Sequence, residues 1–442
     1  MNEKLQAVFG DPVDEKALKQ IETVLDDDRA VKGALMSDHH LGYSMPIGGV
    51  VAYKNAISPS GVGFDIACGN KCVRTDMLAA DLGDVRPWMR LIQQKVSFGL
   101  GRSNPTPVDH ELFDYGVWHD IDPGKGSPLK QKAREQLGTV GSGNHYVDLL
   151  VDDDGYVWVA NHLGSRGLGH TIATMGLRWA YGLGPDDRNV ERDEPAVLDL
   201  DTDEGRLYLD AMELAGDYAY AGRDYVIDQV ISILGRPNVT FSVHNHHNYA
   251  WQEDGLWVVR KGATPLTLEP AFIGGSMGDI SVIVRGKPDK GFEDGHVYGV
   301  EDIGALESAP HGAGRTMSRT AAAGKLRKMW LCPNRNCTDY VPVRSIGNAA
   351  PVGGGRCPFC NTVLRKLRIR DTSDAAIDWK AVRADLAARG ITVLGSGADE
   401  APGVYKDLAS VLAFHSNIEV LHTLNPIGVV MAGDDVRDPY QD

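Results

Sequence analysis

The chain has 442 residues, of which 43% are hydrophobic and 24% are charged, and its formal charge at pH 7 is −15. This composition predicts a large folded core and excludes a disordered chain. No run approaches the roughly 20 apolar residues of a membrane-spanning helix, and the N-terminus lacks the basic-then-apolar order of a signal peptide. We therefore expect a cytoplasmic protein whose six cysteines are thiols or metal ligands rather than disulfides.

The order of apolar and polar residues predicts a mixed α/β (α+β) fold. Residues 12–27 have helical spacing of Leu18, Ile21 and Leu25, and helical patterns recur at 204–235 and 374–389. Between them lie short apolar runs broken by glycine clusters, such as IGGVVAY and VWVANHLGSRG. The runs VTFSVHNHHNYA and WVVRKGATPL predict two strands joined by a turn at Asp254-Gly255. Polar motifs at the ends of these runs indicate a ligand-binding edge.

Several of these polar motifs carry side chains that ligate metals. Asp65 and Cys68 lie three residues apart on a glycine-flanked turn, and a thiolate can bridge two transition metals. Imidazoles follow in three glycine-, serine- or asparagine-rich segments: His145, then His162 and His170, then His244, His246 and His247. If the last segment is a strand, His247 faces away from His244 and His246. A single such histidine is more often structural, but the set favours a centre of one or two ions, with manganese, iron and zinc all open.

Phosphate-binding loops form the next group of candidates. In Ser308-Ala309-Pro310-His311-Gly312-Ala313-Gly314-Arg315, a histidine precedes a flexible turn whose amides can bind an anion. A neutral imidazole there can attack phosphorus and form a labile phosphoramidate. The segments RKGAT at 260–264 and GGSMG at 274–278 are further loops of this kind, and no Walker loop is present.

Cysteines near the C-terminal third predict a zinc ribbon. Cys332 and Cys337 are followed, after a Gly-, Pro- and Val-rich stretch, by Cys357 and Cys360, a spacing typical of a structural Zn²⁺ site. The same region is strongly basic inside an acidic chain, because Arg315–Arg370 carries twelve Lys and Arg residues and one acid, Asp339. We expect this module to grip RNA, or otherwise to be a purely structural knuckle.

Taken together, these motifs resemble the RtcB family of RNA-splicing ligases. The order of nine segments is the family's own: DHHLGYSMPIGG, GVGFDIACG, GSGNHYVDL, HLGSRGLGH, HHNYA, RKGAT, GSMG, SAPHGAGRTMSR and DEAPGVYKD. The resemblance covers roughly residues 34–325 and 390–430. It implies an RtcB-like catalytic domain at 1–325 and 367–442, with the zinc ribbon inserted at 326–366, in place of the two or three domains that length alone suggests.

The resemblance also implies an activity and a set of site residues. The family joins RNA 3′-phosphate or 2′,3′-cyclic phosphate ends to 5′-hydroxyl ends with GTP and two Mn²⁺ ions, as in tRNA processing or RNA repair. By resemblance, His311 carries GMP, and Cys68 bridges the metals with Asp65 and His145 on one and His162 and His247 on the other. The positions matching the nucleotide contacts are Asn144, Asp148, Ser276, Ser281, Ala313, Gly314 and Tyr405. His170, His244, His246 and Cys72 are left as structural residues. A monomer is expected, and the need for a helper protein is left open.

The sequence departs from the family pattern on the side that contacts the base. Asp148 stands where the family usually has glutamate, and Ile427–Gly433 replaces a terminal segment whose lysine contacts the nucleotide. Losing a charge-assisted hydrogen bond of about 1.5–3 kcal/mol would relax guanine specificity. Two other functions are weighed against the ligase: a binuclear-metal phosphodiesterase that opens cyclic phosphates without joining ends, and a zinc-ribbon RNA-binding protein with a vestigial site.

Overall fold

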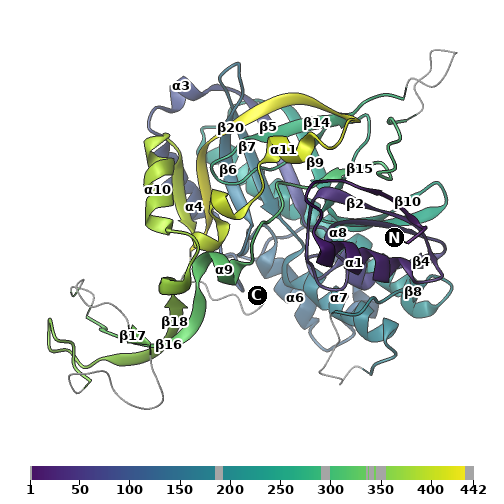
Figure 1. Cartoon of the computed structure of the whole chain (residues 1–442), viewed down its shortest axis with the longest axis horizontal. Coiled ribbons are helices and arrows are strands. Elements are labelled where there is room, and N and C mark those ends of the chain that lie inside the picture. Colours follow the sequence, from purple (N-terminus) through teal and green to yellow (C-terminus); the bar gives the residue numbers. More distant parts are fainter. Residues whose placement is uncertain are drawn as a thin grey trace.

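The computed structural model of the chain describes residues 2–184, 193–289, 299–334, 337, 343–344 and 355–433. The predicted mixed α/β class is confirmed, with two large sheets and helices packed around them (Figure 1). Among the described helices, none is long and apolar enough to cross a membrane.

The larger sheet is eight-stranded and mainly antiparallel. Its strands, in spatial order, are β13 (Ala271–Ile273), β14 (Ser281–Gly286), β20 (Ile418–Gly433), β6 (Tyr146–Val151), β7 (Tyr156–Leu163), β5 (Gly69–Leu78) and β9 (Val239–His246), with β19 (Thr392–Ser396) parallel to β20. The five-stranded sheet runs β1 (Leu5–Val8), β2 (Ala30–His40), β3 (Ile47–Tyr53), β11 (Leu256–Lys261) and β10 (Asn248–Glu253). Two short pairs complete the body: β4 (Ala56–Ile57) with β8 (Leu198–Asp199), and β12 (Ala263–Pro265) with β15 (Ser308–Pro310).

Helices cover these sheets. The predicted N-terminal helix is α1 (Glu15–Leu25), where Asp14 caps the amides of Lys16 and Ala17 and Ile21 is fully buried. The predicted pattern at 204–235 is α8 (Asp203–Ile233), which packs against α7, β5 and β7, and that at 374–389 is α10 (Trp379–Ala388). The other helices are α2 (Pro59–Val62), α3 (Ala79–Leu82), α4 (Val85–Lys95), α5 (Trp118–Ile121), α6 (Pro128–Gln136), α7 (Arg166–Ala180), α9 (Arg319–Ala323) and α11 (Leu408–Leu412).

The segment 239–250 corrects one prediction. The turn at Asp254-Gly255 joins β10 to β11 as expected, and both residues have positive φ. The preceding run, however, is two strands in two different sheets, because the chain leaves β9 at His246 and enters β10 at Asn248. His247 is the single residue that connects the two strands. Its amide donates to the Cys68 carbonyl over 2.8 Å, and its carbonyl accepts from the Ala263 amide over 3.1 Å. The two sheets therefore meet at this residue.

A small third sheet projects from the body. It contains β16 (Lys325–Leu331), β17 (Val343–Arg344) and β18 (Arg365–Asp371) in the order β17-β16-β18, and it extends at the lower left of Figure 1. We call β16, β17, β18 and the cysteine segments between them the arm. Arg335 and Asp339, which belong to the predicted basic window, lie outside the described residues.

The start of β5 depends on a glycine. A Cβ built on Gly69 would lie 2.1 Å from the Asn245 carbonyl oxygen of β9, so β9 can approach only because residue 69 has no side chain. We predict that Gly69→Ala lowers the free energy of unfolding by about 1–3 kcal/mol through overpacking, measured by urea unfolding. The matched control Gly116→Ala, where a Cβ meets nothing within 4 Å, should change stability by less than about 0.5 kcal/mol. Equal effects of the two substitutions would contradict this account.

Candidate active site

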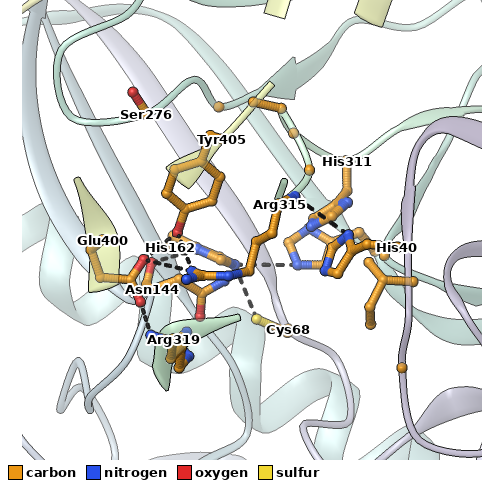
Figure 2. A pocket seen from close by; sticks show the side chains of 18 of the residues that line it. His40, Cys68, Asn144, His162, Ser276, His311, Arg315, Arg319, Glu400 and Tyr405 are labelled. Atoms are coloured by element: carbon orange, nitrogen blue, oxygen red, sulfur yellow. Dashed lines mark hydrogen bonds and ion pairs between the residues drawn. The ribbon is translucent and has the colours of Figure 1, made fainter. Parts of the chain in front are cut away.

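A cavity of about 780 Å³ is lined by segments from both large sheets. Most of the predicted site residues line it, as Figure 2 shows for several: Asp65, Cys68, Asn144, Asp148, His162, His247, Ser276, His311, Ala313, Gly314 and Tyr405. His145 and Ser281 do not line the cavity and are buried behind it. Residues that are far apart in the chain thus meet at one place because they stand at strand ends and crossings.

Electron-pair donors converge at the floor of this cavity. Cys68 Sγ lies 3.3 Å from His145 Nε2 and 3.1 Å from His162 Nε2. The His162 Nε2 atom lies 3.2 Å from His247 Nε2, and His145 Nε2 lies 2.9 Å from Asp65 Oδ2. The ligand atoms of Cys68, His145 and His162 all lie within 4.8 Å of one another. All five side chains predicted to bind the manganese ions therefore form one continuous cluster.

The electrostatics of this cluster suit a cation. Burial lowers the pKa of His162 and of His247 well below the usual range, so their rings are neutral and carry lone pairs at neutral pH. Burial also raises the pKa of the Cys68 thiol, so a thiolate there needs a compensating positive charge. Burial alone would raise the pKa of Asp65, but His145 outweighs it and lowers that pKa to about 2. The oxygen, nitrogen and sulfur donors fit a transition metal.

Residues behind the cluster fix its geometry. The Asn144 carbonyl oxygen lies 3.0 Å from His162 Nδ1, which leaves Nε2 directed toward Cys68. Arg223, fully buried in α8, donates to the carbonyl oxygens of Ala67 and Leu163 over 2.9 and 2.8 Å. Ala67 has a φ of 59°, so this hydrogen bond holds a strained turn beside Cys68.

The histidines that were left without a role lie outside the cluster. Arg223 lies 2.8 Å from both His244 Nε2 and His246 Nδ1, whereas His247, which follows the end of β9, lies beside His162. His170 stacks on Phe64, with ring centroids 5.1 Å apart. Cys72 is buried in the apolar core beneath β5.

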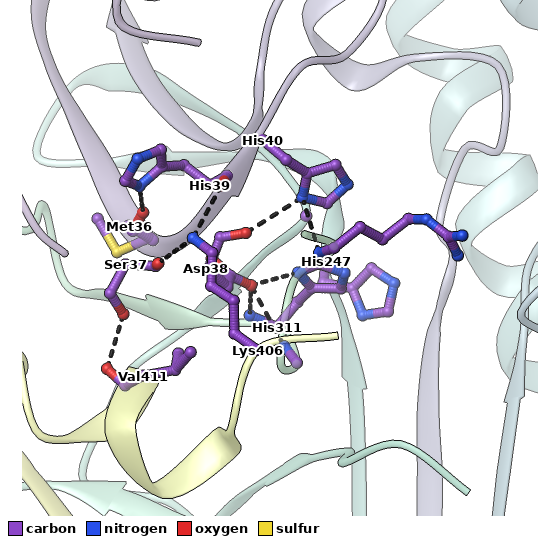
Figure 3. A network of polar contacts seen from close by, with 12 residues as sticks. Met36, Ser37, Asp38, His39, His40, His247, His311, Lys406 and Val411 are labelled. Atoms are coloured by element: carbon purple, nitrogen blue, oxygen red, sulfur yellow. Dashed lines mark hydrogen bonds and ion pairs between the residues drawn. The ribbon is translucent and has the colours of Figure 1, made fainter. Parts of the chain in front are cut away.

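His311 stands at the rim of the cluster, and an acid holds one of its nitrogens. Asp38, at 0% exposure, has Oδ2 at 2.7 Å from His311 Nδ1, and the same oxygen accepts from the His311 amide over 3.0 Å (Figure 3). The His311 ring centroid lies 4.8 Å from that of His247. Burial would raise the pKa of Asp38, but its electrostatic interaction and hydrogen bond with the His311 ring outweigh burial, so that pKa is lowered. The other ring nitrogen, Nε2, is not used by this acid.

The turn after His311 also depends on Asp38. The Gly312 amide donates to Asp38 Oδ2 over 3.3 Å. Gly314 has a φ of 72°, and a Cβ there would lie 2.1 Å from the Asp38 carbonyl oxygen. Lys406 braces the same strand by donating to the carbonyl oxygens of Ser37 and His39 over 2.8 and 3.0 Å. One buried strand end therefore shapes the whole His311 loop.

A cluster of arginines and acids forms the wall of the cavity opposite His311. Arg319 pairs with Asp399 over 3.2 Å and with Glu400, and Tyr405 donates to Glu400. Arg315 Nη1 lies 3.1 Å from the Tyr405 hydroxyl. Burial raises the pKa of Tyr405 above the ordinary tyrosine range, so this hydroxyl stays protonated. The arginines are thus held in place, with their charge partly balanced by the two acids.

The remaining predicted nucleotide positions lie along β6, β14 and β20. Ser276 donates to Asp279, and Ser281 Oγ accepts from the Gly275 amide over 3.0 Å. Asp148 is paired in register with Val429, next to Met431 of the segment that lacks the lysine. Among the described residues no hydrogen-bond partner reaches Asp148 Oδ1, and burial raises the pKa of this carboxyl well above its usual range. Burial therefore disfavours the charged form of this carboxyl.

The four cysteines of the arm also converge. Their sulfur atoms lie within 4.8 Å of one another, with Cys332 and Cys360 3.4 Å apart and Cys337 and Cys357 3.6 Å apart. The hydroxyl and amide of Thr362 lower the pKa of Cys360 to about 6, which favours the thiolate. Four thiols in this arrangement fit a tetrahedral structural zinc ion.

Sequence reasoning assigned no role to several residues that line or support the cavity. Asp38, Arg319 and Glu400 lie in the quoted segments DHHLGYSMPIGG, SAPHGAGRTMSR and DEAPGVYKD, so the signal was present. Arg223 was missed because it lies within the helical pattern of 204–235, and nothing in the sequence relates it to Ala67.

Known proteins resemble this chain over the same segments. The family model described as tRNA-splicing ligase RtcB matches residues 20–333. The RNA-splicing ligase RtcB of Escherichia coli K12 is 31% identical over 318 residues, covering 65% of this chain and 75% of the relative. The tRNA-splicing ligases RtcB of Archaeoglobus fulgidus and Aeropyrum pernix are each 30% identical, covering 67% and 65% of this chain and 75% and 74% of their own length.

The two metal-binding clusters can be separated by experiment. We predict that Cys337→Ser with Cys360→Ser removes one zinc per chain, measured by elemental mass spectrometry, because two of four thiolates are lost. Metal bound at the Cys68 cluster should be retained, because that cluster uses none of these side chains. Unchanged zinc content in the double variant would contradict a four-thiolate site.

Proposed function

This chain belongs to the RtcB family, and from that premise we propose that it is an RNA ligase acting through a guanylylated His311. It joins RNA 3′-phosphate or 2′,3′-cyclic phosphate ends to 5′-hydroxyl ends, with GTP as co-substrate. The observation that carries the proposal is the 2.7 Å contact of Asp38 Oδ2 with His311 Nδ1 beside the Cys68 cluster. Because Asp38 occupies Nδ1, Nε2 is the nitrogen that can attack phosphorus.

The reaction proceeds in three displacements at phosphorus. His311 Nε2 attacks the α-phosphorus of GTP, forming an N–P bond as pyrophosphate leaves. An oxygen of the RNA 3′-phosphate then displaces the imidazole and takes the GMP group. Finally the oxygen of a 5′-hydroxyl attacks the 3′-phosphorus, GMP leaves, and the hydroxyl proton passes to solvent or a nearby base. A cyclic phosphate is first opened by water to the 3′-phosphate.

The chain's own residues support each displacement. Asp38 orients the His311 ring and stabilises the positive charge that the ring gains when Nε2 forms a bond. The glycine-rich turn Gly312–Gly314 and Arg315 border the cavity where a triphosphate would lie. Tyr405 and Glu400 hold Arg315 in that position.

The Cys68 cluster is proposed to hold two Mn²⁺ ions, with Cys68 shared, Asp65 and His145 on one ion and His162 and His247 on the other. Bound manganese would neutralise phosphate charge and activate water for opening the cyclic phosphate. The proposal is supported by the donor distances and by the neutral imidazoles described above. Asn144, Ser276, Ser281, Ala313, Gly314 and Tyr405 are proposed as nucleotide contacts.

Guanine recognition is the part of the proposal that the local chemistry modifies. The edge of guanine presents two N–H donors, which need two acceptor oxygens from the protein. A protonated Asp148 supplies only one acceptor, because its other oxygen is a donor. Met431, which stands at the position of the family's lysine on the strand paired with that of Asp148, has no charge that would keep this carboxyl ionised. We therefore propose that discrimination between GTP and other nucleotides is weaker here than in relatives with the glutamate and the lysine.

A covalent adduct tests the ligase function. We predict that incubation with Mn²⁺ and each labelled nucleoside triphosphate gives a His311-linked nucleotide with GTP, detected by peptide mass spectrometry and lost in His311→Ala. A phosphodiesterase without ligation would instead keep cyclic-phosphate hydrolysis in His311→Ala and lose it in Cys68→Ala. No adduct with any nucleotide from a chain shown to hold its metal would overturn the ligase proposal.

The role of Asp38 can be tested separately. We predict that Asp38→Asn slows adduct formation by tenfold or more, because the amide cannot stabilise the charge that His311 gains. Rapid-quench measurement of the adduct gives this rate, and manganese content of the variant should equal that of the wild type. The matched control is Asp203→Asn, whose exposed side chain pairs with Arg206 in the first turn of α8, outside the cavity. An adduct rate within twofold of wild type for Asp38→Asn would contradict this role.

A further inference from the structure

The two long strands of the arm present chemically different faces. Strand alternation and register place Leu326, Lys328 and Trp330 of β16 on one face with Lys366 and Arg370 of β18, since Leu326 pairs with Arg370 and Trp330 with Lys366. We call this set the basic face. None of its members is acidic. The opposite face carries Arg327, which is paired with Asp371 over 3.5 Å and with Asp374 over 3.0 Å.

The basic face begins at the rim of the cavity. Arg370 Nη2 lies 4.0 Å from Asp399 Oδ2, and Asp399 also pairs with Arg319, which lines the cavity. The chain itself makes the same connection, because Arg319 starts α9 and β16 follows directly at Lys325. Basic side chains therefore continue from the cavity wall onto the arm, which extends away from the body (Figure 1). At roughly 3.3 Å per residue, the seven residues of β16 span about 23 Å.

The arm also exposes apolar and aromatic groups among its cations. Leu326 is 47% exposed, and Lys366 Nζ lies 5.8 Å from the centre of the Trp330 ring. Phe359, between the last two cysteines, is 61% exposed, which is unusual for a side chain of this size. Cations that follow a phosphate backbone, together with rings on which bases stack, are the pattern of a single-strand binding surface.

We propose that the basic face binds the single-stranded RNA that flanks the end held in the cavity, a proposal that rests on the ligase function above. Phosphates lie against Lys328, Lys366 and Arg370, and a base stacks on Phe359. A zinc ion held by the four cysteines would stabilise the strands that carry these side chains, so that the arm could bind the RNA substrate beside the cavity.

The salt dependence of RNA binding can be compared between variants of the basic face and variants of the opposite face of β16 and β18. The probe is an unreactive 3′-hydroxyl oligouridylate of about 16 nucleotides, long enough for a single-strand site. We predict that Lys328→Gln with Lys366→Gln in the full zinc-loaded chain lowers the slope of log affinity against log salt by about 1.4, which is about 0.7 for each lost phosphate contact. Near 0.15 M salt this corresponds to about a tenfold loss of affinity.

The matched control is Lys325→Gln with Arg365→Gln, which removes the same charge from the same two strands on the opposite face. It should leave the slope within about 0.3 of the wild type. Phe359→Ala should weaken binding about fivefold or more at every salt concentration without changing the slope, because stacking releases no counterions. An unchanged slope in the basic-face variant, or an equal loss in both pairs, overturns the proposal.

The outcome is independent of the ligase chemistry. Adduct formation by the wild-type chain tests the proposed ligase function and needs no RNA. The salt dependence of RNA binding tests the basic face and needs no reaction. If the basic-face variant binds RNA as the wild type does while the adduct forms, the ligase proposal stands and the surface proposal fails. That result would point to a protein partner for the arm.

Discussion

The close approach of nitrogen and sulfur donor atoms at Cys68 is the constraint on which the rest of the site depends. A thiol and three imidazoles, with nitrogen and sulfur atoms 3.1–3.3 Å apart, cannot share a buried space as lone pairs unless protons or a cation lie between them. Burial lowers the pKa of His162 and His247, so these rings are neutral and can offer nitrogen lone pairs to a cation. The crossing at His247 and the buried Arg223 hold this arrangement in place.

The two ends of the cavity differ in how many hydrogen bonds hold their key side chains. At the phosphate end, Asp38 binds the His311 side chain and two backbone amides with one oxygen, so a single residue sets both the nucleophile and its loop. At the end near β20, Asp148 is buried without a hydrogen-bond partner for Oδ1 among the described residues. The His311 loop is thus fixed by hydrogen bonds, whereas Asp148 Oδ1 has no such bond among the described residues. This difference is consistent with a ligase that keeps its reaction while its preference for a nucleotide or an RNA changes.

The arm differs from the body of the protein in how it is held together and in what it exposes. Its strands β16 and β18 pair with each other, and its four cysteine sulfur atoms lie within 4.8 Å of one another, which fits stabilisation by a bound zinc ion. A module stabilised in this way can expose Leu326 and Phe359 without losing its structure. Exposed apolar and aromatic side chains among basic residues fit the proposed contact with single-stranded RNA.

The sequence by itself determined the local elements and the chemical types. Helical spacing located α1, α8 and α10, and the Asp254-Gly255 turn predicted the β10–β11 hairpin. Residue types and spacing indicated a four-cysteine set and a metal centre of oxygen, nitrogen and sulfur donors, whereas the five ligands around Cys68 were implied by the family resemblance. These features depend on neighbours in the chain, so periodicity and spacing carry them. The tertiary structure decided the rest: that the run 239–250 divides between two sheets at His247, that Asp38 reaches His311 across 273 residues, and that Arg223 supports the Cys68 turn. Such contacts join segments brought together by sheet packing, and no local pattern encodes which distant strand will be the neighbour.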